Sequence, residues 1–334
     1  MSIEILDFSR PPNGKERKAF ASRLARLEGN YGKMVEFAAK RLRSRPSGGG
    51  SLSRHGFRIR KTFCYLENAP KGNYSDRTVP PRCERPPATR ISSSRGSTLR
   101  FYLLAIAMTQ MEKGAGGAGV ALPIVGNTRS AGWTDFVVTD AGDNSGINFI
   151  ASKDKRARSV RSSLKALERE QLLKFVAASG KRGSLEKYHL LDEMGGQGSH
   201  IEPYKVPRSH EEVIALPSEF ILNSWINVLE DSEISLLLMI ACGKGGFYND
   251  GFVAIPSNVR LLHYGIGRDP YMLARKTLEQ FGLIEVEEVG RHSDGRADSE
   301  EGYFPHRFRV LEDGFKKQAL PTAIGILKQQ LHRK

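Results

Sequence analysis

One stretch of this chain is present twice, and the repetition constrains the fold more than any other feature. Residues 158–175 read RSVRSSLKALEREQLLKF, and residues 269–286 read DPYMLARKTLEQFGLIEV. An ungapped offset of 111 pairs Leu167 with Leu278, Glu168 with Glu279 and Leu172 with Leu283. Each copy has apolar residues at helical spacing followed by a short apolar run, which predicts an amphipathic helix that leads into a strand. The chain is therefore expected to contain two related units.

A polar, Gly-containing loop and a second apolar segment follow each copy. In the first unit we expect a helix over 153–171, a strand over 172–178, a tip at SGKRGS and a returning strand over 185–190. In the second unit we expect strands over 283–289 and 307–312. Helix, strand, loop and strand form the second half of a winged helix, and the helix of that motif commonly enters the DNA major groove.

The predicted fold is therefore α+β and mostly helical, with two tandem winged-helix domains over 98–192 and 211–315. Apolar segments at 99–111 and 232–242 predict a buried helix at the start of each domain. Asp269 and Pro270 have the residue types of a helix N-cap and first position. A linker over 193–210 separates the domains, and a C-terminal amphipathic helix occupies 316–334.

The excess positive charge of the chain lies at its N-terminal end. Residues 1–100 contain 22 Lys and Arg against 8 Asp and Glu, whereas the rest of the chain contains 29 of each kind. We expect residues 1–97 to form a basic region, helical over 14–45 and loop-rich afterwards, with one strand over 57–66. Such a region favours a polyanionic partner, and the alternative is a solvated tail without a fixed partner. The apolar stripe of the 14–45 helix either packs on the body of the protein or pairs with its copy in a homodimer.

Basic side chains on the repeated helices are the candidate DNA-binding residues. On the first helix, a spacing of three and four places Arg158, Arg161, Lys165 and Arg169 along one face, and Lys181 and Arg182 lie at the following tip. The second copy offers Arg268, Tyr271, Arg275 and Lys276. Arg275 takes the place of Leu164, which is a departure from strict repetition. For the first set, the alternative is a helix face that only meets solvent. For Arg275, either the second helix is slightly rotated or the side chain points outward for a different use.

Other classes of protein lack support in the sequence. The three cysteines form no C-x-x-C pair, which favours a reducing compartment and predicts no metal site. The N-terminal residues do not resemble a signal peptide, and no apolar run approaches the roughly 18 residues of a membrane span. We expect a cytoplasmic protein without a membrane partner. Gly114–Gly119 matches G-x-G-x-x-G but follows an apolar helix instead of a strand, so we expect no nucleotide or other cofactor. No catalytic motif is evident, and we expect no enzymatic activity.

The segment from LPSEFILNSW to HRFRVLEDGF resembles the winged-helix domains of bacterial DNA-binding regulators. With LEREQLLKF in the first unit, the two-unit arrangement is similar to plasmid replication initiators built from tandem winged helices. The resemblance implies sequence-specific binding of double-stranded DNA through both repeated helices. We expect a transcriptional regulator, with a plasmid replication initiator as the first alternative. A winged-helix scaffold that binds other proteins in a DNA-maintenance complex is the alternative from another class.

Overall fold

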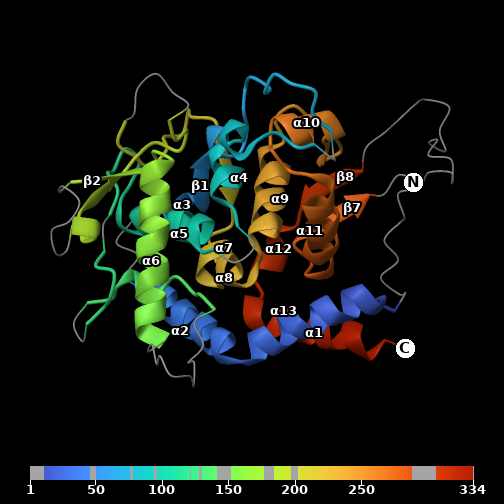
Figure 1. The fold of residues 1–334 in the computed structure, drawn as a ribbon, viewed down its shortest axis with the longest axis horizontal. Helices are drawn as coiled ribbons and strands as arrows, with labels where there is room; N and C mark the ends of the chain where they lie inside the picture. Colours follow the sequence, from blue (N-terminus) through green and yellow to red (C-terminus); the bar gives the residue numbers. More distant parts are fainter. Residues whose placement is uncertain are drawn as a thin grey trace.

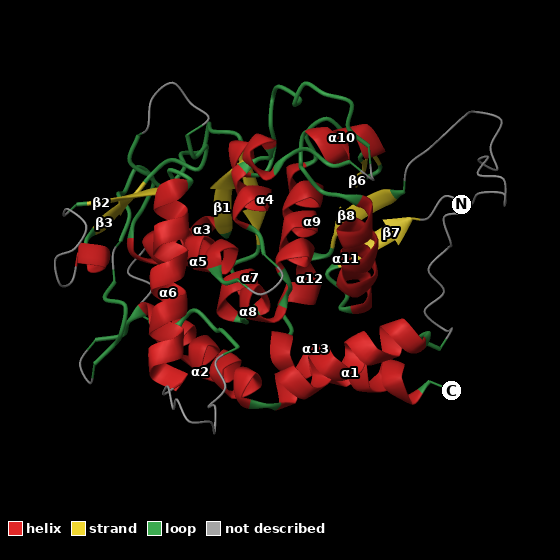
Figure 2. Ribbon diagram, viewed as in Figure 1, coloured by secondary structure: helices red, strands yellow, loops and turns green. Residues whose placement is uncertain are grey.

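Helix α5, Thr98–Glu112, lies inside the fold and is buried on every side (Figure 1). All residues from Leu99 to Met111 are buried, as an apolar helix of this composition requires. The computed structural model describes residues 11–45, 50–75, 78–93, 96–120, 122–127, 130–140, 152–176, 184–196, 202–287 and 306–333. Within these residues the fold is α+β and mostly helical, with small antiparallel sheets (Figure 2).

The C-terminal half contains a four-stranded sheet with helices packed against it. The helices are α9 (Asp231–Cys242), α10 (Ser257–Leu262) and α11 (Arg268–Gln280), and the strands are β5 (Phe247–Asn249), β6 (Phe252–Ala254), β7 (Ile284–Glu287) and β8 (Arg307–Val310). The strand order is β5-β6-β8-β7, and neighbouring strands are antiparallel. The N-cap of α11 is Gly267, two residues before Asp269, so the predicted start of this helix was wrong. Asp269 and Pro270 still lie in the first turn, where Pro removes no helical hydrogen bond.

The first repeat forms α6 (Ser152–Arg169), β2 (Leu173–Phe175) and β3 (Tyr188–Leu190). β2 and β3 are antiparallel, with Leu173 opposite Leu190, so the predicted helix leads into a hairpin. The region upstream differs from the second unit. Between α5 and α6, the described residues contain only the short 3₁₀ helix Trp133–Asp135 and no counterpart of β6 or α10.

The two repeats share the same helix ending. Gln171 has φ 57° and Gly282 has φ 70°, and these residues are related by the sequence offset of the repeat. The Leu172 amide donates to the Leu167 carbonyl at 2.9 Å, and the Leu283 amide donates to the Leu278 carbonyl at 3.0 Å. A left-handed residue at this point ends a helix and satisfies one of its last carbonyls. The strands β2 and β7 begin two residues after it in both copies.

The left-handed position predicts an asymmetric response to substitution. Gly282→Gln, which introduces the residue of the first copy, should lower the free energy of unfolding by about 1 kcal/mol, because a side chain is disfavoured at positive φ. The space around Gly282 is open, so a clash does not contribute. Urea denaturation measures the change, and Gly325→Gln at an open helical position should instead be neutral or stabilising. An unchanged stability for Gly282→Gln would contradict the strain argument.

The N-terminal region is part of the body of the protein. The predicted helix over 14–45 is two helices, α1 (Gly14–Glu28) and α2 (Asn30–Ser44), separated at Gly29. Its apolar stripe packs within the chain, because Leu27, Tyr31 and Val35 are almost fully buried. This agrees with the first of the two alternatives for the stripe, and the face is not free to pair with a second copy.

The loop-rich segment also contributes to the core. The strand predicted over 57–66 is shorter and forms only β1 (Phe57–Arg60), followed by the 3₁₀ helix Lys61–Phe63. β1 pairs with β4 (Val213–Leu216), which lies about 150 residues further along the chain. Short helices flank this region, namely α3 (Ser51–His55), the 3₁₀ helix Arg82–Glu84 and α4 (Pro87–Ile91).

The predicted linker and the C-terminal segment are also packed. Glu193, Tyr204 and Val206 are fully buried, so these described residues of the predicted linker pack into the fold. Two short helices follow β4 and are separated at Ser224, which has φ 61°. They are α7 (Glu219–Leu222) and α8 (Trp225–Val228), and the chain ends with α12 (Glu312–Phe315) and α13 (Ala319–His332). α13 packs beside α1 along one edge of the molecule (Figure 2).

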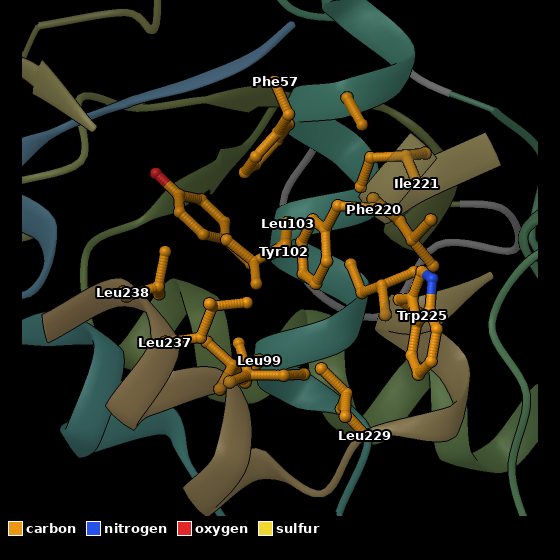
Figure 3. Packing of buried hydrophobic residues seen from close by; sticks show 14 of the residues in the cluster. Phe57, Leu99, Tyr102, Leu103, Phe220, Ile221, Trp225, Leu229, Leu237 and Leu238 are labelled. Carbon is orange, nitrogen blue, oxygen red and sulfur yellow. The ribbon is translucent and has the colours of Figure 1, made fainter. Parts of the chain in front are cut away.

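One hydrophobic cluster joins segments from most of the chain length. Figure 3 shows Phe57 of β1 and Tyr102 of α5 beside residues of α7, α8 and α9. The Phe57 and Phe220 rings have centroids 5.9 Å apart, and those of Phe63 and Tyr102 are 5.3 Å apart. Burial of this apolar surface is the main stabilising contribution, and removing residues 1–97 would expose it to water.

Candidate nucleic-acid interface

Helix α6 separates an apolar face from a basic face. Val160, Leu164 and Leu167 are fully buried, and they hold the helix against α5. Hydroxyl groups add a polar contact at the start of α5, where Ser97 Oγ lies 3.0 Å from Ser159 Oγ and 3.1 Å from Ser163 Oγ. Among the described residues, the apolar face of α6 is therefore the one that anchors the helix.

The four basic residues predicted on this helix lie together on its other side. They are Arg158, Arg161, Lys165 and Arg169, and all four are exposed. Their side chains form no ion pair or hydrogen bond with any other residue that the structure describes. Asp154 and Glu168 are the exposed acids on the same helix, so the face keeps a net positive charge. Lys181 and Arg182, expected at the tip of the hairpin, lie outside the described residues.

The second repeated helix does not present the predicted basic face. Arg275 is fully buried, so it is not available to DNA in this conformation. Its inward position follows from the repeat, because Arg275 occupies the place of the buried Leu164. Lys276 Nζ lies 2.6 Å from Glu16 Oε1 of α1, which neutralises its charge.

The remaining predicted residues of α11 are of mixed character. Arg268 is exposed at the first helical position. Tyr271 is half-buried between the guanidinium of Arg260, 5.0 Å from its ring centroid, and the ring of Phe308. Leu273 is 54% exposed and adds an apolar side chain to the surface of this helix. α6 and α11 are therefore alike in backbone and unlike in surface.

Much of the N-terminal positive charge is neutralised within the molecule. Arginines of the first 100 residues pair with carboxylates far away in the sequence, namely Arg23 with Glu233, Arg26 with Glu230, Arg45 with Glu112, Arg60 with Glu193, Arg90 with Glu170 and Arg100 with Asp231. These side chains are not available for phosphate groups. These six arginines are therefore engaged within the molecule, and the remaining basic residues of the N-terminal region carry the charge that a polyanion could meet.

Arg23 makes the best-formed of these pairs. Its Nη1 and Nη2 lie 2.6 Å and 2.8 Å from the two carboxylate oxygens of Glu233, and Nη2 also donates to the Val228 carbonyl. Its guanidinium lies 5.1 Å from the centroid of the Phe281 ring. The pair joins α1 to the first turn of α9, where a carboxylate is also favoured by the helix dipole. Both side chains are largely excluded from solvent.

A second buried pair connects β1 to the predicted linker. Arg60 Nη1 lies 2.5 Å from Glu193 Oε2, and Arg60 Nε donates to Glu211 Oε2 at 2.5 Å. Burial raises the pKa of Glu193 to about 7, although Arg60 opposes this shift and Asp192 adds to it. Burial likewise raises the pKa of Asp231 to about 6. Glu193 and Asp231 are enclosed by the residues that they pair with, which indicates a structural role for both carboxylates.

Comparisons of the chain with protein-family models, with curated proteins and with solved structures find no match. Among the helices of the described residues, none combines the length and apolar character needed to cross a membrane. Over the same residues, His, Cys, Asp and Glu side chains form no group suited to a metal ion. Cys64 and Cys242 are buried thiols, and Cys83 is an exposed one.

Proposed function

We propose that this chain binds double-stranded DNA in a sequence-specific manner, as a transcriptional regulator, with α6 as its recognition helix. The observation that supports this most is the face formed by Arg158, Arg161, Lys165 and Arg169, which is exposed and has no partner among the described residues, on a helix whose other face is anchored. Arg and Lys donate to guanine in the major groove and to phosphates. A helix that is held rigidly loses little conformational entropy when it binds.

The topology of the C-terminal half supports a winged-helix assignment. α10 and α11 follow β6 as a pair of helices joined by a short turn, and β7 and β8 then form a hairpin with β6 beside β8. This order of helices and strands is the one expected of a winged helix. The same ending of α6 and α11 supports a common origin of the two units. We propose that the first unit supplies most of the DNA contact. The second unit would contribute less, because α11 does not present the predicted basic face.

Two other functions stay open to test. A plasmid replication initiator would use the same DNA contact, and its distinguishing property is a binding site within an origin of replication. A protein-interaction scaffold is favoured by one observation, the exposed Leu273 on α11 together with the ion-paired Lys276. We propose no catalytic role. The carboxylates that border a surface hollow of about 580 Å³ are engaged, Glu67 by Lys244 and Glu84 by Tyr74.

The role of α6 predicts a change in specificity. A cognate duplex is first selected from random DNA with the wild-type protein. Arg161→Ala should then weaken binding to the cognate duplex by roughly 1–3 kcal/mol, and weaken binding to a scrambled duplex less, because a base contact is lost. Fluorescence anisotropy at a fixed salt concentration measures the affinity for each duplex. The variant should keep wild-type stability, since Arg161 is exposed and has no partner within the described chain.

Lys18→Ala provides the matched control. Lys18 is exposed on α1, whose first residues lie at the side of the molecule away from α6 (Figure 1). The Lys18→Ala variant should bind the cognate and the scrambled duplex with the affinity of the wild type. If Arg161→Ala folds normally and also binds both like the wild type, α6 is not the recognition helix and the scaffold becomes the better hypothesis. Binding that depends strongly on salt separates a DNA-binding protein from a scaffold.

A further inference from the structure

Helix α2 exposes a second basic face. Lys33, Phe37, Lys40 and Arg41 are all exposed, and at 100° per residue they fall within an arc of roughly 100°. The opposite side of the helix is buried in the core, through residues that include Tyr31, Val35, Ala38 and Leu42. The exposed and buried faces are thus cleanly separated, and the exposed one is presented to solvent along the helix.

This face retains positive charge, unlike the six arginines of the N-terminal region that form internal ion pairs. The side chains of Lys33 and Lys40 form no ion pair or hydrogen bond with a described residue. The Arg41 guanidinium lies 5.2 Å from the ring centroid of Phe37, which is 46% exposed. Contact with the ring keeps Arg41 at the surface, where it remains charged and able to donate. Glu36 is the acid on this side of α2, so the face stays positive.

The basic face of α2 lies on an element that touches the proposed recognition helix. Arg156 Nη1 near the start of α6 lies 3.3 Å from Met34 Sδ of α2. Both helices also contact the 3₁₀ helix Trp133–Asp135. Figure 1 shows α2 meeting the end of α6 at which α6 begins. α6 has 18 residues and is about 27 Å long, which corresponds to roughly eight base pairs at 3.4 Å each.

We propose that Lys33, Lys40 and Arg41 bind the phosphate backbone of the same DNA duplex, beyond the base pairs that α6 contacts. This inference rests on the proposed function of α6. Phosphates are the partner that the face fits, because its donors are cationic and no group on it is placed to distinguish bases. The contact would add affinity without sequence preference and would require a duplex longer than the α6 site alone.

The test compares two double variants that remove the same charge. Lys33→Gln with Lys40→Gln removes two lysines from α2, and Lys15→Gln with Lys18→Gln removes two exposed lysines from the far part of α1. Gln and Lys have similar helix propensity, so both proteins should fold. Affinity for a selected duplex of about 30 base pairs is measured from low to moderate salt, and each lost phosphate contact reduces the slope of log K against log salt by about 0.9.

We expect the α2 variant to flatten the salt slope by about 1.8 for two contacts, with the preference for cognate over scrambled DNA unchanged. The α1 variant should keep the wild-type slope. On a duplex of about ten base pairs, which α6 would fill, the α2 variant should bind like the wild type. This length dependence distinguishes a contact beyond α6 from a contact within it.

Three outcomes would overturn the inference. If the α2 variant keeps the wild-type slope while Arg161→Ala loses specificity, the α2 contact is wrong and the proposed function stands. If both double variants flatten the slope equally, overall charge and not the α2 face determines the effect. If the wild-type protein shows no salt-dependent binding to either duplex, the proposed function fails and the α2 contact fails with it.

Discussion

Arg23→Met should lower the free energy of unfolding by about 3–5 kcal/mol, because it leaves the Glu233 carboxylate buried without its cation. Glu233 is 2% exposed, and Arg23 covers both of its oxygens. The Glu233 side chain also accepts from the Glu230 amide at the start of α9, so the disturbance should reach that helix. Urea denaturation followed by circular dichroism measures the change.

Two further variants isolate the charge effect. Adding Glu233→Gln to Arg23→Met should restore part of the loss, because an amide is less costly to bury than an unpaired carboxylate. Lys328→Met breaks the exposed pair of Lys328 with Glu28, also on α1, and should cost at most about 1 kcal/mol. If Arg23→Met costs no more than Lys328→Met, the pair of Arg23 with Glu233 is screened by water and does not hold α1 in place.

Glu193 should make the protein less stable as the pH rises toward neutrality. Burial raises its pKa from an ordinary 4.5 to about 7, so between these values the folded protein keeps a proton that the unfolded chain has lost. The stabilising contribution of protonated Glu193 is complete below pH 4.5, and it is lost as the pH rises through about 7. Relative to Glu193→Gln, which cannot titrate, the wild type should lose up to about 3 kcal/mol between pH 5 and pH 8.

Glu211 on the same guanidinium provides a control of opposite sign. Burial opposes the shift, but the Arg208 amide and the Arg60 guanidinium hold the pKa of Glu211 below its usual range. Relative to Glu211→Gln, the wild type should therefore lose stability as the pH falls through the acidic range. The pKa of Asp231 is raised like that of Glu193, so Asp231 also affects the wild-type stability curve. The stability of the wild type at each pH is therefore compared with that of each Gln variant. A difference between wild type and Glu193→Gln that does not depend on pH would contradict the buried-carboxylate argument.

The elements that local spacing determines were predicted well. α5, α6 and α9 were expected close to their observed limits, since apolar residues at helical intervals specify both a helix and its buried face, and α11 begins two residues before its expected start. The exposed row on α6 could be identified in the same way. The inward position of Arg275 had a signal in the sequence, its alignment with Leu164, but its charge suggested an outward one.

The features that were missed depend on partners distant in the sequence. Arg23 and Glu233 are 210 residues apart, and Arg60 and Glu193 are 133 apart. Counting charges by position therefore indicated a free basic region, although many of its arginines are neutralised by acids of the other half. The pairing of β1 with β4 is equally non-local, because a single alternating segment does not specify its neighbour. Local sequence patterns indicate where these residues lie along an element, but their partners are determined by the packing of distant segments.

The contact between α1 and α13 has a consequence for the order of folding. Arg17 near the start of α1 donates to the carbonyls of Leu331 and Arg333, so the first helix of the described chain is completed by the last. Forming this contact closes a loop of about 300 residues. Loop closure has an entropic cost that earlier packing must offset. We expect docking of α1 on α13 to be a late and slow step, which requires that α13 has already been synthesised. Until then, the apolar sides of both helices are exposed to chaperones and to other nascent chains.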